Sequence, residues 1–92
     1  MSKHHTVVLH DIRSMDDVYA QLARQLPLPA HFGRNLDALF DLLTADLEGS
    51  LTLNWPDAAD ARPYLGADRH AALLTTLRDA ADERDDLHLR IG

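Results

Sequence analysis

Three short apolar runs, spaced widely along the chain, predict strands over residues 6–10, 51–55 and 87–91. The last two runs alternate apolar and polar residues, which is typical of strands with one buried face. The first contains a continuous Val-Val-Leu core at residues 7–9, and this favours a strand covered on both sides. We therefore expect the first strand to lie in the middle of the sheet.

Between these runs the apolar residues recur at the three- and four-residue spacing of amphipathic helices. This spacing covers four segments: residues 15–26, 36–47, a single short turn within 56–63, and 68–83. Ser14 precedes the first segment and Asp17 follows three residues later, which resembles a capping box with Asp in place of the usual Glu. The sequence thus predicts where the first helix begins.

The elements alternate in the order β-α-α-β-(α)-α-β, so each connection between strands is long and helical. Such connections predict parallel strands joined by right-handed crossovers. No repeat, low-complexity tract or linker divides the 92 residues, and that length suits one domain. The sequence therefore predicts a single α/β domain over residues 1–92, with a three-stranded parallel sheet covered by helices.

The amino-acid composition of the chain limits the kinds of partner that it can bind. The 15 acidic residues against 9 basic ones give a formal net charge of −6, which disfavours nucleic acids and anionic membranes and favours a basic partner. The chain has no cysteine, so disulfides, thiol catalysis and thiolate zinc sites are excluded. Its apolar runs are far shorter than the roughly 20 residues of a membrane span, and its first residues lack the apolar region of a secretory signal. We expect a cytoplasmic protein.

The stretch HFGRNLDALFDLL, residues 31–43, carries two aspartates four residues apart, Asp37 and Asp41. Like charges at this spacing are neighbours on a helix and destabilise it by roughly a few tenths of a kcal/mol. With Asn35 as N-cap, Asp37 lies in the first turn, where the helix macrodipole favours a carboxylate. Asp41 lies further along and has no counterion three or four residues away on either side. Local helix stability therefore explains Asp37 but not Asp41.

A second group of carboxylates crowds the end of the last predicted helix, where the macrodipole favours cations instead. Its members are Asp79, Asp82, Glu83, Asp85 and Asp86. Two acidic clusters placed against local helix stability indicate an electronegative surface for binding, and they form one patch if the two helices lie side by side. A solvated helix face is the alternative for the aspartate pair, because isolated surface charges are common.

The sequence gives little support for a catalytic site, a metal site or a nucleotide-binding site. A catalytic carboxylate pair needs one pKa raised by burial or by its neighbour, and nothing in residues 31–43 predicts a deep cleft. The six histidines show no HxxxH or other ligand spacing, and the four glycines are scattered rather than gathered into a phosphate-binding loop. Trp55 closes a strand and is expected to be a packed aromatic residue. We therefore expect a protein that is not an enzyme and that uses no metal or cofactor.

The run LPLPAHFGRNLDALFDLLT, residues 26–44, resembles the barstar family of small bacterial ribonuclease inhibitors. The family pattern is a proline, an aromatic pair, glycine, then Asn-Leu-Asp-Ala-Leu, an aromatic residue and Asp. The early strand with IRSMDDVYAQL is similar to the family's first strand and helix, and LTLNW to its second strand with a terminal Trp. LLTTLRDAADERDDLHLRI is similar to its last helix and strand, so the resemblance covers nearly the whole chain.

Barstar-like proteins occupy the active site of a secreted, guanyl-preferring ribonuclease before its export and so protect the cell that makes it. The resemblance implies an intracellular inhibitor of a basic, barnase-type ribonuclease, monomeric when free, whose helix carboxylates take the places of RNA phosphates. Asp41 matches the family's central anchor and Asp37 its second acidic contact. The other positions that match contact residues of the family are His31, Phe40, Thr44, Asp79 and Glu83.

Four positions depart from the family's usual residues and leave the target open. His31 stands where a Tyr is usual and Phe40 where a Trp is frequent, while Asp46 replaces an aromatic residue and Asp79 a longer Glu. The partner is therefore either a related nuclease with a different rim or another toxin domain, for which the chain would be an immunity or interaction module on the same fold. A small metal-binding protein or enzyme that uses the aspartates and histidines is the alternative from a different class.

Overall fold

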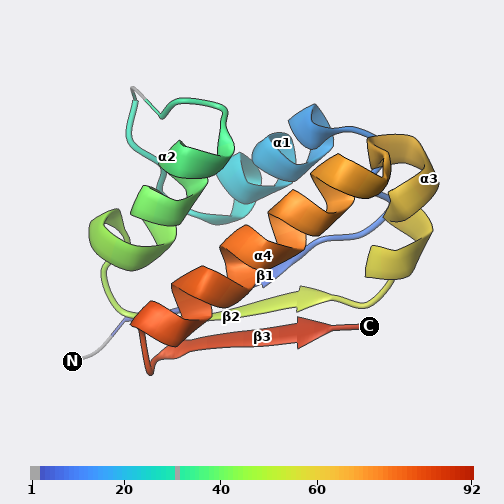
Figure 1. Ribbon diagram of the computed structural model, residues 1–92. Helices are drawn as coiled ribbons and strands as arrows, with labels where there is room; N and C mark the ends of the chain where they lie inside the picture. The colour runs from blue at the N-terminus through green and yellow to red at the C-terminus, as the bar shows by residue number, and fades with distance from the viewer. Residues whose placement is uncertain (1–2, 31) are drawn as a thin grey trace.

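Three strands form one parallel sheet in the computed structural model, which describes residues 3–30 and 32–92 (Figure 1). They are β1 (His4–Val8), β2 (Ser50–Trp55) and β3 (Leu87–Ile91), in the spatial order β1-β2-β3. In the register of the sheet, Thr6 lies beside Thr52, and Thr52 lies beside His88. The parallel sheet and its helical connections confirm the predicted α/β fold.

The prediction that the first strand lies in the middle of the sheet is wrong, because β2 lies between β1 and β3. Helices cover only one face of the sheet (Figure 1), so even the central strand alternates between buried and less buried residues. In β2, Leu51 and Leu53 are fully buried. In β1, Val7 is fully buried, but Val8 faces the uncovered side and is 40% exposed. The apolar run at residues 7–9 therefore does not indicate cover on both sides.

The first strand also begins and ends earlier than predicted, at His4 and Val8. Beyond Val8, the backbone polar groups of His10 form hydrogen bonds with a side chain of α1 (Met15–Gln25). The N–H of His10 donates to Gln21 Oε1 at 3.1 Å, and its carbonyl accepts from Gln21 Nε2 at 2.8 Å. The Gln21 side chain thus binds the backbone polar groups of His10, just beyond the last residue of β1.

Only one of the two hydrogen bonds of the predicted capping box is present at the start of α1. The Ser14 hydroxyl accepts from the N–H of Asp17 at 3.1 Å. The Asp17 carboxylate accepts from the N–H of Arg13 at 2.9 Å, however, and not from that of Ser14. The capping box is therefore half formed. Val18 and Leu22 of this helix are fully buried in the core.

The helix predicted over residues 36–47 is divided into two kinds of helix. α2 (Leu36–Asp41) is followed directly by the π-helical segment η1 (Leu42–Asp46). The spacing of apolar residues cannot distinguish these windings over so short a segment. Leu39 and Leu43 are both fully buried, so the apolar side of the segment stays on the core across the change.

The short turn predicted within residues 56–63 is present and extends further. η2 (Ala58–Ala61) is a 3₁₀ turn that runs into α3 (Arg62–Leu65). Gly66 ends α3 with a φ of 87°, a conformation that glycine adopts without the steric cost of a Cβ. α4 (Ala67–Glu83) begins directly after it, one residue before the predicted start.

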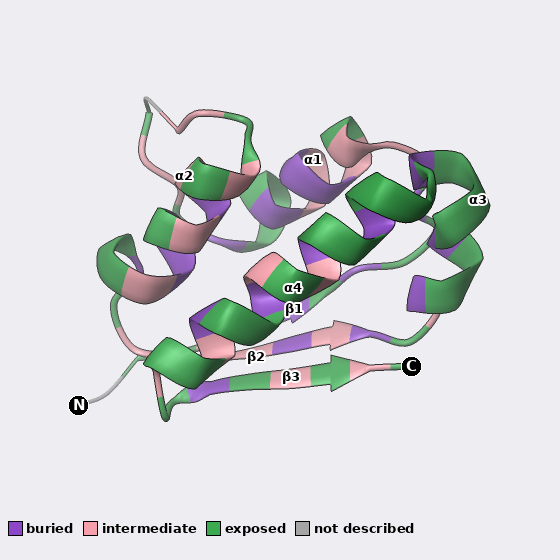
Figure 2. Cartoon of the chain, viewed as in Figure 1, coloured by how far each residue is buried: buried purple, intermediate pink, exposed green. Residues whose placement is uncertain are grey.

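The helices α1, α2 and α4 lie over the same face of the sheet, and their buried residues meet it in one core (Figure 2). Trp55 is fully buried, as the sequence predicts, and its ring centroid lies 6.0 Å from that of His70. His70 Nε2 donates to the Ala58 carbonyl at 2.8 Å, so this histidine fastens η2 to α4. Within the described residues, no helix is both long and apolar enough to cross a membrane.

Candidate functional site

The helix α2 directs Asp37 and Asp41 to solvent. The Asn35 side chain caps the helix by accepting from the N–H of Ala38 at 2.7 Å, as the sequence predicts. Leu39, on the side of the helix that faces the sheet, is fully buried. Asp37 and Asp41 are therefore exposed neighbours, one turn apart on the outer side of α2.

Acidic residues of α2 and α4 meet in one place. An open hollow of about 550 Å³ between the two helices is lined by Leu36, Asp37, Phe40, Asp41, Thr76 and Asp79. We call this surface the acidic hollow. Its three carboxylates come from elements far apart in the sequence, so members of the two predicted acidic clusters do form a single patch.

Within the described residues, no cation forms an ion pair with these three carboxylates. The ion pairs found there join Lys3 to Glu48, Arg13 to Asp11 and Arg84 to Asp86. Asp37, Asp41 and Asp79 are each exposed. The acidic hollow therefore presents its negative charge to solvent, where a partner of opposite charge can reach it.

Other members of the predicted C-terminal cluster lie apart from the hollow. Glu83 is exposed at the last position of α4. Asp86 lies beyond the helix and accepts two hydrogen bonds from the Arg84 guanidinium, at 2.9 and 3.0 Å. These bonds lower the pKa of Asp86. Asp86 thus has a structural partner and is not part of the acidic hollow.

The remaining predicted contact positions divide into three cases. Phe40 is half-buried and lines the hollow. Thr44 lies in η1, where its hydroxyl donates to the Phe40 carbonyl at 2.8 Å, and it does not line the hollow. His31 lies outside the described residues. Leu36 and Thr76 line the hollow without having been singled out, because each is an ordinary member of a helix pattern in the sequence.

Arg84 has a role that the sequence did not indicate. Its Nε and Nη2 donate to Asp86, its Nη1 donates to the carbonyls of Leu43 and Leu47, and its Nη2 also donates to that of Gly49. The side chain is only 15% exposed. Arginine near a helix end commonly binds the last carbonyls of its own helix, whereas this one binds carbonyls of another segment. Arg84 therefore joins the end of η1 to the end of α4, and with it the two walls of the acidic hollow.

An open hollow lined by carboxylates suits hydrogen-bond donors that carry positive charge. Arginine is the best match, because its planar guanidinium binds a carboxylate through two parallel bonds. The ring of Phe40 adds an aromatic surface on which a guanidinium can stack. In residues 3–30 and 32–92, no three His, Asp or Glu side chains gather where they could hold a metal ion. The geometry supports binding of a basic protein surface.

Comparison with known protein families agrees with this geometry. Residues 2–91 match the family described as Barstar (barnase inhibitor), so the match covers nearly the whole chain. It confirms the resemblance of residues 26–44, and the family it identifies is one of inhibitors and not of enzymes.

Proposed function

The chain belongs to the barstar family, and from this premise we propose that it is an intracellular inhibitor of a barnase-type microbial ribonuclease. The observation that carries the proposal is the acidic hollow. Three carboxylates from α2 and α4 stand exposed there, without an ion-pair partner in the part of the chain that the structure describes. The inhibitor places these carboxylates where the phosphates of RNA would bind.

The active-site cleft of a ribonuclease is complementary in charge to such a surface. The cleft has to attract phosphate groups, so it carries cationic side chains, and their hydrogen bonds to carboxylates are charge-assisted and strong. Asp41 is the principal anchor, with Asp37 one turn earlier and Asp79 facing it from α4. The surrounding contacts come from His31, Phe40, Thr44 and Glu83.

The proposal accounts for the placement of Asp41. An aspartate pair one turn apart costs the free helix roughly a few tenths of a kcal/mol. Truncating one partner of a buried, hydrogen-bonded charge pair in an interface typically costs about 2 kcal/mol or more of binding free energy. The gain on binding exceeds the cost to the helix several-fold, so the pair is favourable in an inhibitor and unfavourable in a bare scaffold.

A toxin domain other than a ribonuclease is the second candidate target. Asp46 is exposed at the end of η1, at a position where the family's usual residue is aromatic. A carboxylate there changes the rim of the binding surface and favours a partner with a more basic edge. In that case the chain is an immunity protein that uses the same acidic hollow as its anchor.

Titration of a barnase-type ribonuclease with wild type, Asp41→Ala and Asp60→Ala tests the proposal. Asp60 is exposed in η2 and does not line the hollow, so its variant removes the same charge at another place. We expect stoichiometric inhibition by wild type and by Asp60→Ala. Inhibition by Asp41→Ala should be at least about 30-fold weaker, which corresponds to about 2 kcal/mol.

Thermal unfolding of the three proteins supplies the control, because each must be folded for the comparison to hold. A folded wild-type protein that does not inhibit the barnase-type ribonuclease would contradict the proposal. A pull-down for basic partners would then identify the toxin that the acidic hollow binds.

A further inference from the structure

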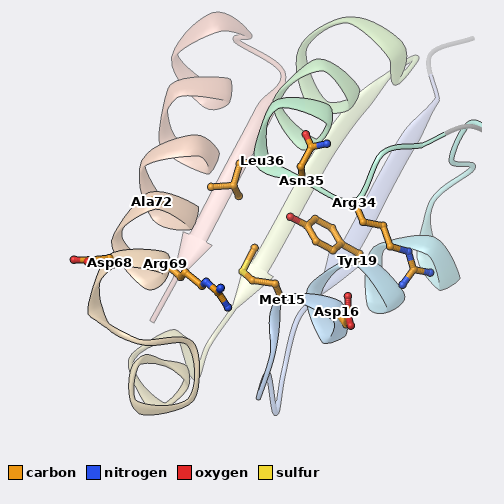
Figure 3. A pocket seen from close by; sticks show the side chains of 9 residues that line it. All are labelled: Met15, Asp16, Tyr19, Arg34, Asn35, Leu36, Asp68, Arg69 and Ala72. Atoms are coloured by element: carbon orange, nitrogen blue, oxygen red, sulfur yellow. The ribbon is translucent and has the colours of Figure 1, made fainter.

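A second hollow lies beside the acidic one, where α1, α2 and α4 begin (Figure 3). It measures about 580 Å³, and Arg34 and Arg69 stand at its edges. Its apolar floor is made by Met15, Tyr19, Leu36 and Ala72. Leu36 also lines the acidic hollow, so the two surfaces are continuous. We call this second surface the arginine-flanked hollow.

Tyr19 places a polar group within the apolar floor. Only 4% of the residue is exposed, its ring packs edge-on against Phe32 at a centroid distance of 6.0 Å, and its hydroxyl points into the hollow (Figure 3). Burial, followed by the carboxylate of Asp16, raises the pKa of Tyr19, so the hydroxyl stays protonated and can donate. Among the described residues this hydroxyl forms no hydrogen bond. The hydroxyl is not among the fully buried polar atoms that lack a partner, so water reaches it, and the acceptor group of an occupant can replace that water.

The charged residues at the edges offer further donors. Arg34 and Arg69 are exposed, and in the described part of the chain neither forms an ion pair. Asp16 and Asp68 also border the hollow, but the Asp68 side chain points away from it (Figure 3). The Arg69 guanidinium points toward Met15, whereas that of Arg34 extends from the rim away from Leu36 (Figure 3). One guanidinium group and the Tyr19 hydroxyl therefore face the apolar floor. The chemical group that fits is an apolar side chain beside a carboxylate, since a carboxylate can accept from both the Tyr19 hydroxyl and the Arg69 guanidinium.

We propose that the arginine-flanked hollow is a second subsite of the ribonuclease interface, and that it takes an apolar side chain of the enzyme that lies next to a carboxylate. The inference rests on the proposed function, because a partner seated on the acidic hollow reaches the adjoining surface across Leu36. Among the described residues, cationic donors line only the second subsite, because the acidic hollow is lined by carboxylates without an arginine or lysine. An enzyme docked the other way round would set like charges against each other, so the pair of subsites fixes the orientation of the complex.

Reversing the charge of the two arginines tests this subsite, because it should weaken the complex if they contact the enzyme and should not if they lie outside the contact. The chain already carries a net charge of −6, so added negative charge outside the contact should speed association with a basic enzyme. Within a subsite that binds a carboxylate, the double variant Arg34→Glu with Arg69→Glu should instead speed dissociation at least about tenfold. Surface plasmon resonance with the ribonuclease that wild type inhibits measures both rates.

The matched control is Arg24→Glu with Arg62→Glu, since both arginines are exposed and neither lines the hollow. It makes the same change in net charge and should leave dissociation unchanged. A double reversal at Arg34 and Arg69 that behaves like this control would overturn the inference.

Tyr19→Phe is a second variant that removes one oxygen and keeps the ring packed on Phe32. The hydroxyl has no partner among the described residues, so the variant should be as stable as wild type or slightly more stable. Its dissociation from the enzyme should be faster by about threefold or more, because the complex loses one hydrogen bond. Unchanged dissociation would count against the subsite.

The outcomes separate this inference from the proposed function. If Asp41→Ala loses inhibition while the Arg34, Arg69 and Tyr19 variants bind like wild type, the proposed function stands and the second subsite is overturned. If folded wild type inhibits no ribonuclease, the proposed function is overturned and the subsite with it.

Discussion

The side-chain amide of Gln25 pairs with both backbone polar groups of Val8, as a neighbouring strand would. The Val8 N–H donates to Gln25 Oε1 at 2.9 Å, and Gln25 Nε2 donates to the Val8 carbonyl at 2.9 Å. Gln21, one turn earlier in α1, makes the same pair of bonds to His10. The helix therefore covers the end of the β1 edge, whose unpaired groups would otherwise be open to another chain.

Replacing Gln25 by Met keeps the length of the side chain and removes both bonds to Val8. We expect the free energy of unfolding to fall by about 1 kcal/mol, because water partly replaces the lost bonds at this exposed edge. Urea denaturation measures the change. Arg24→Met, at the exposed neighbouring position, is the control and should change stability by less than about 0.5 kcal/mol. Equal losses in the two variants would show that the amide pairing contributes nothing.

Arg84→Met removes five hydrogen bonds, of which three join the end of α4 to the carbonyls of Leu43, Leu47 and Gly49 and two go to Asp86. We expect a loss of about 2–4 kcal/mol, because several partly buried carbonyls are left without a donor. Arg84→Lys should recover little of it, since an ammonium group cannot reach the same acceptors in that planar arrangement. Arg78→Met, exposed on α4, is the control for loss of charge. A loss below about 1 kcal/mol in Arg84→Met would contradict the proposed role.

Asp86 should give the protein an acid-dependent component of stability. Hydrogen bonds from Arg84 lower the pKa of Asp86 in the folded state below its ordinary value of 3.8. A carboxylate with a lowered folded pKa stabilises the fold above its ordinary pKa, and this contribution is lost as the pH falls through the folded value. The stability difference between wild type and Asp86→Asn should therefore be largest near neutral pH and should shrink below about pH 3.8.

Urea denaturation at a series of pH values measures that difference. Asp85→Asn, at the exposed preceding position, removes the same charge without removing the bonds from Arg84 and is the matched control. A difference between wild type and Asp86→Asn that stays constant from pH 7 to pH 3 would exclude the ion pair as its cause.

The two aspartates of α2 should respond differently when each is neutralised. Asp41→Asn should raise the free energy of unfolding by roughly a few tenths of a kcal/mol, because it relieves repulsion from Asp37. Asp37→Asn relieves the same repulsion but loses the favourable position in the first helical turn, so its stability should stay level or fall. Thermal unfolding at low ionic strength compares them. Equal stabilisation by the two variants would show that the position in the first turn has no effect.

Salt should act mainly on the rate of association with the enzyme. The three carboxylates of the acidic hollow are exposed, so their long-range attraction to a basic partner is screened as ionic strength rises. Between about 50 and 500 mM salt we expect association to slow much more than dissociation speeds up. Stopped-flow mixing measures both rates, and an association rate that is independent of salt would exclude steering by this surface.

Local patterns were enough to predict most of the fold. Ser14 and Asn35 cap α1 and α2 as expected, and the long helical connections give parallel strands. The order of the strands was predicted wrongly, because the apolar run at residues 7–9 has a different cause. Leu9 continues into the core beyond the last residue of β1, while Val8 faces the uncovered side of the sheet. A run of apolar letters does not show which of these two cases applies.

The candidate site was predicted in its residue types and only partly in its geometry. Asp37 and Asp41 are exposed together as expected, and Asp79 joins them across a contact between helices that the sequence left open. The bonds from Arg84 to backbone carbonyls have no signature in the sequence, because carbonyl groups are present at every residue. The arginine-flanked hollow was missed for a related reason: its floor includes Tyr19, which in the sequence is simply one member of the α1 stripe.

Because β2 is the central strand, neither β1 nor β3 can pair in the sheet before β2 is available. β1 and β3 each pair with β2 and not with one another, and the pairs join distant segments, such as His4 with Ser50 and Leu51 with Leu87. Contacts of such high order slow folding, because long loops must close before pairing stabilises them. During synthesis β1 has no strand partner until residues 50–55 have been made, and the acidic hollow gains its second wall only with α4. The acidic hollow should therefore become able to bind a partner abruptly, once α4 has been made, instead of gradually with chain length.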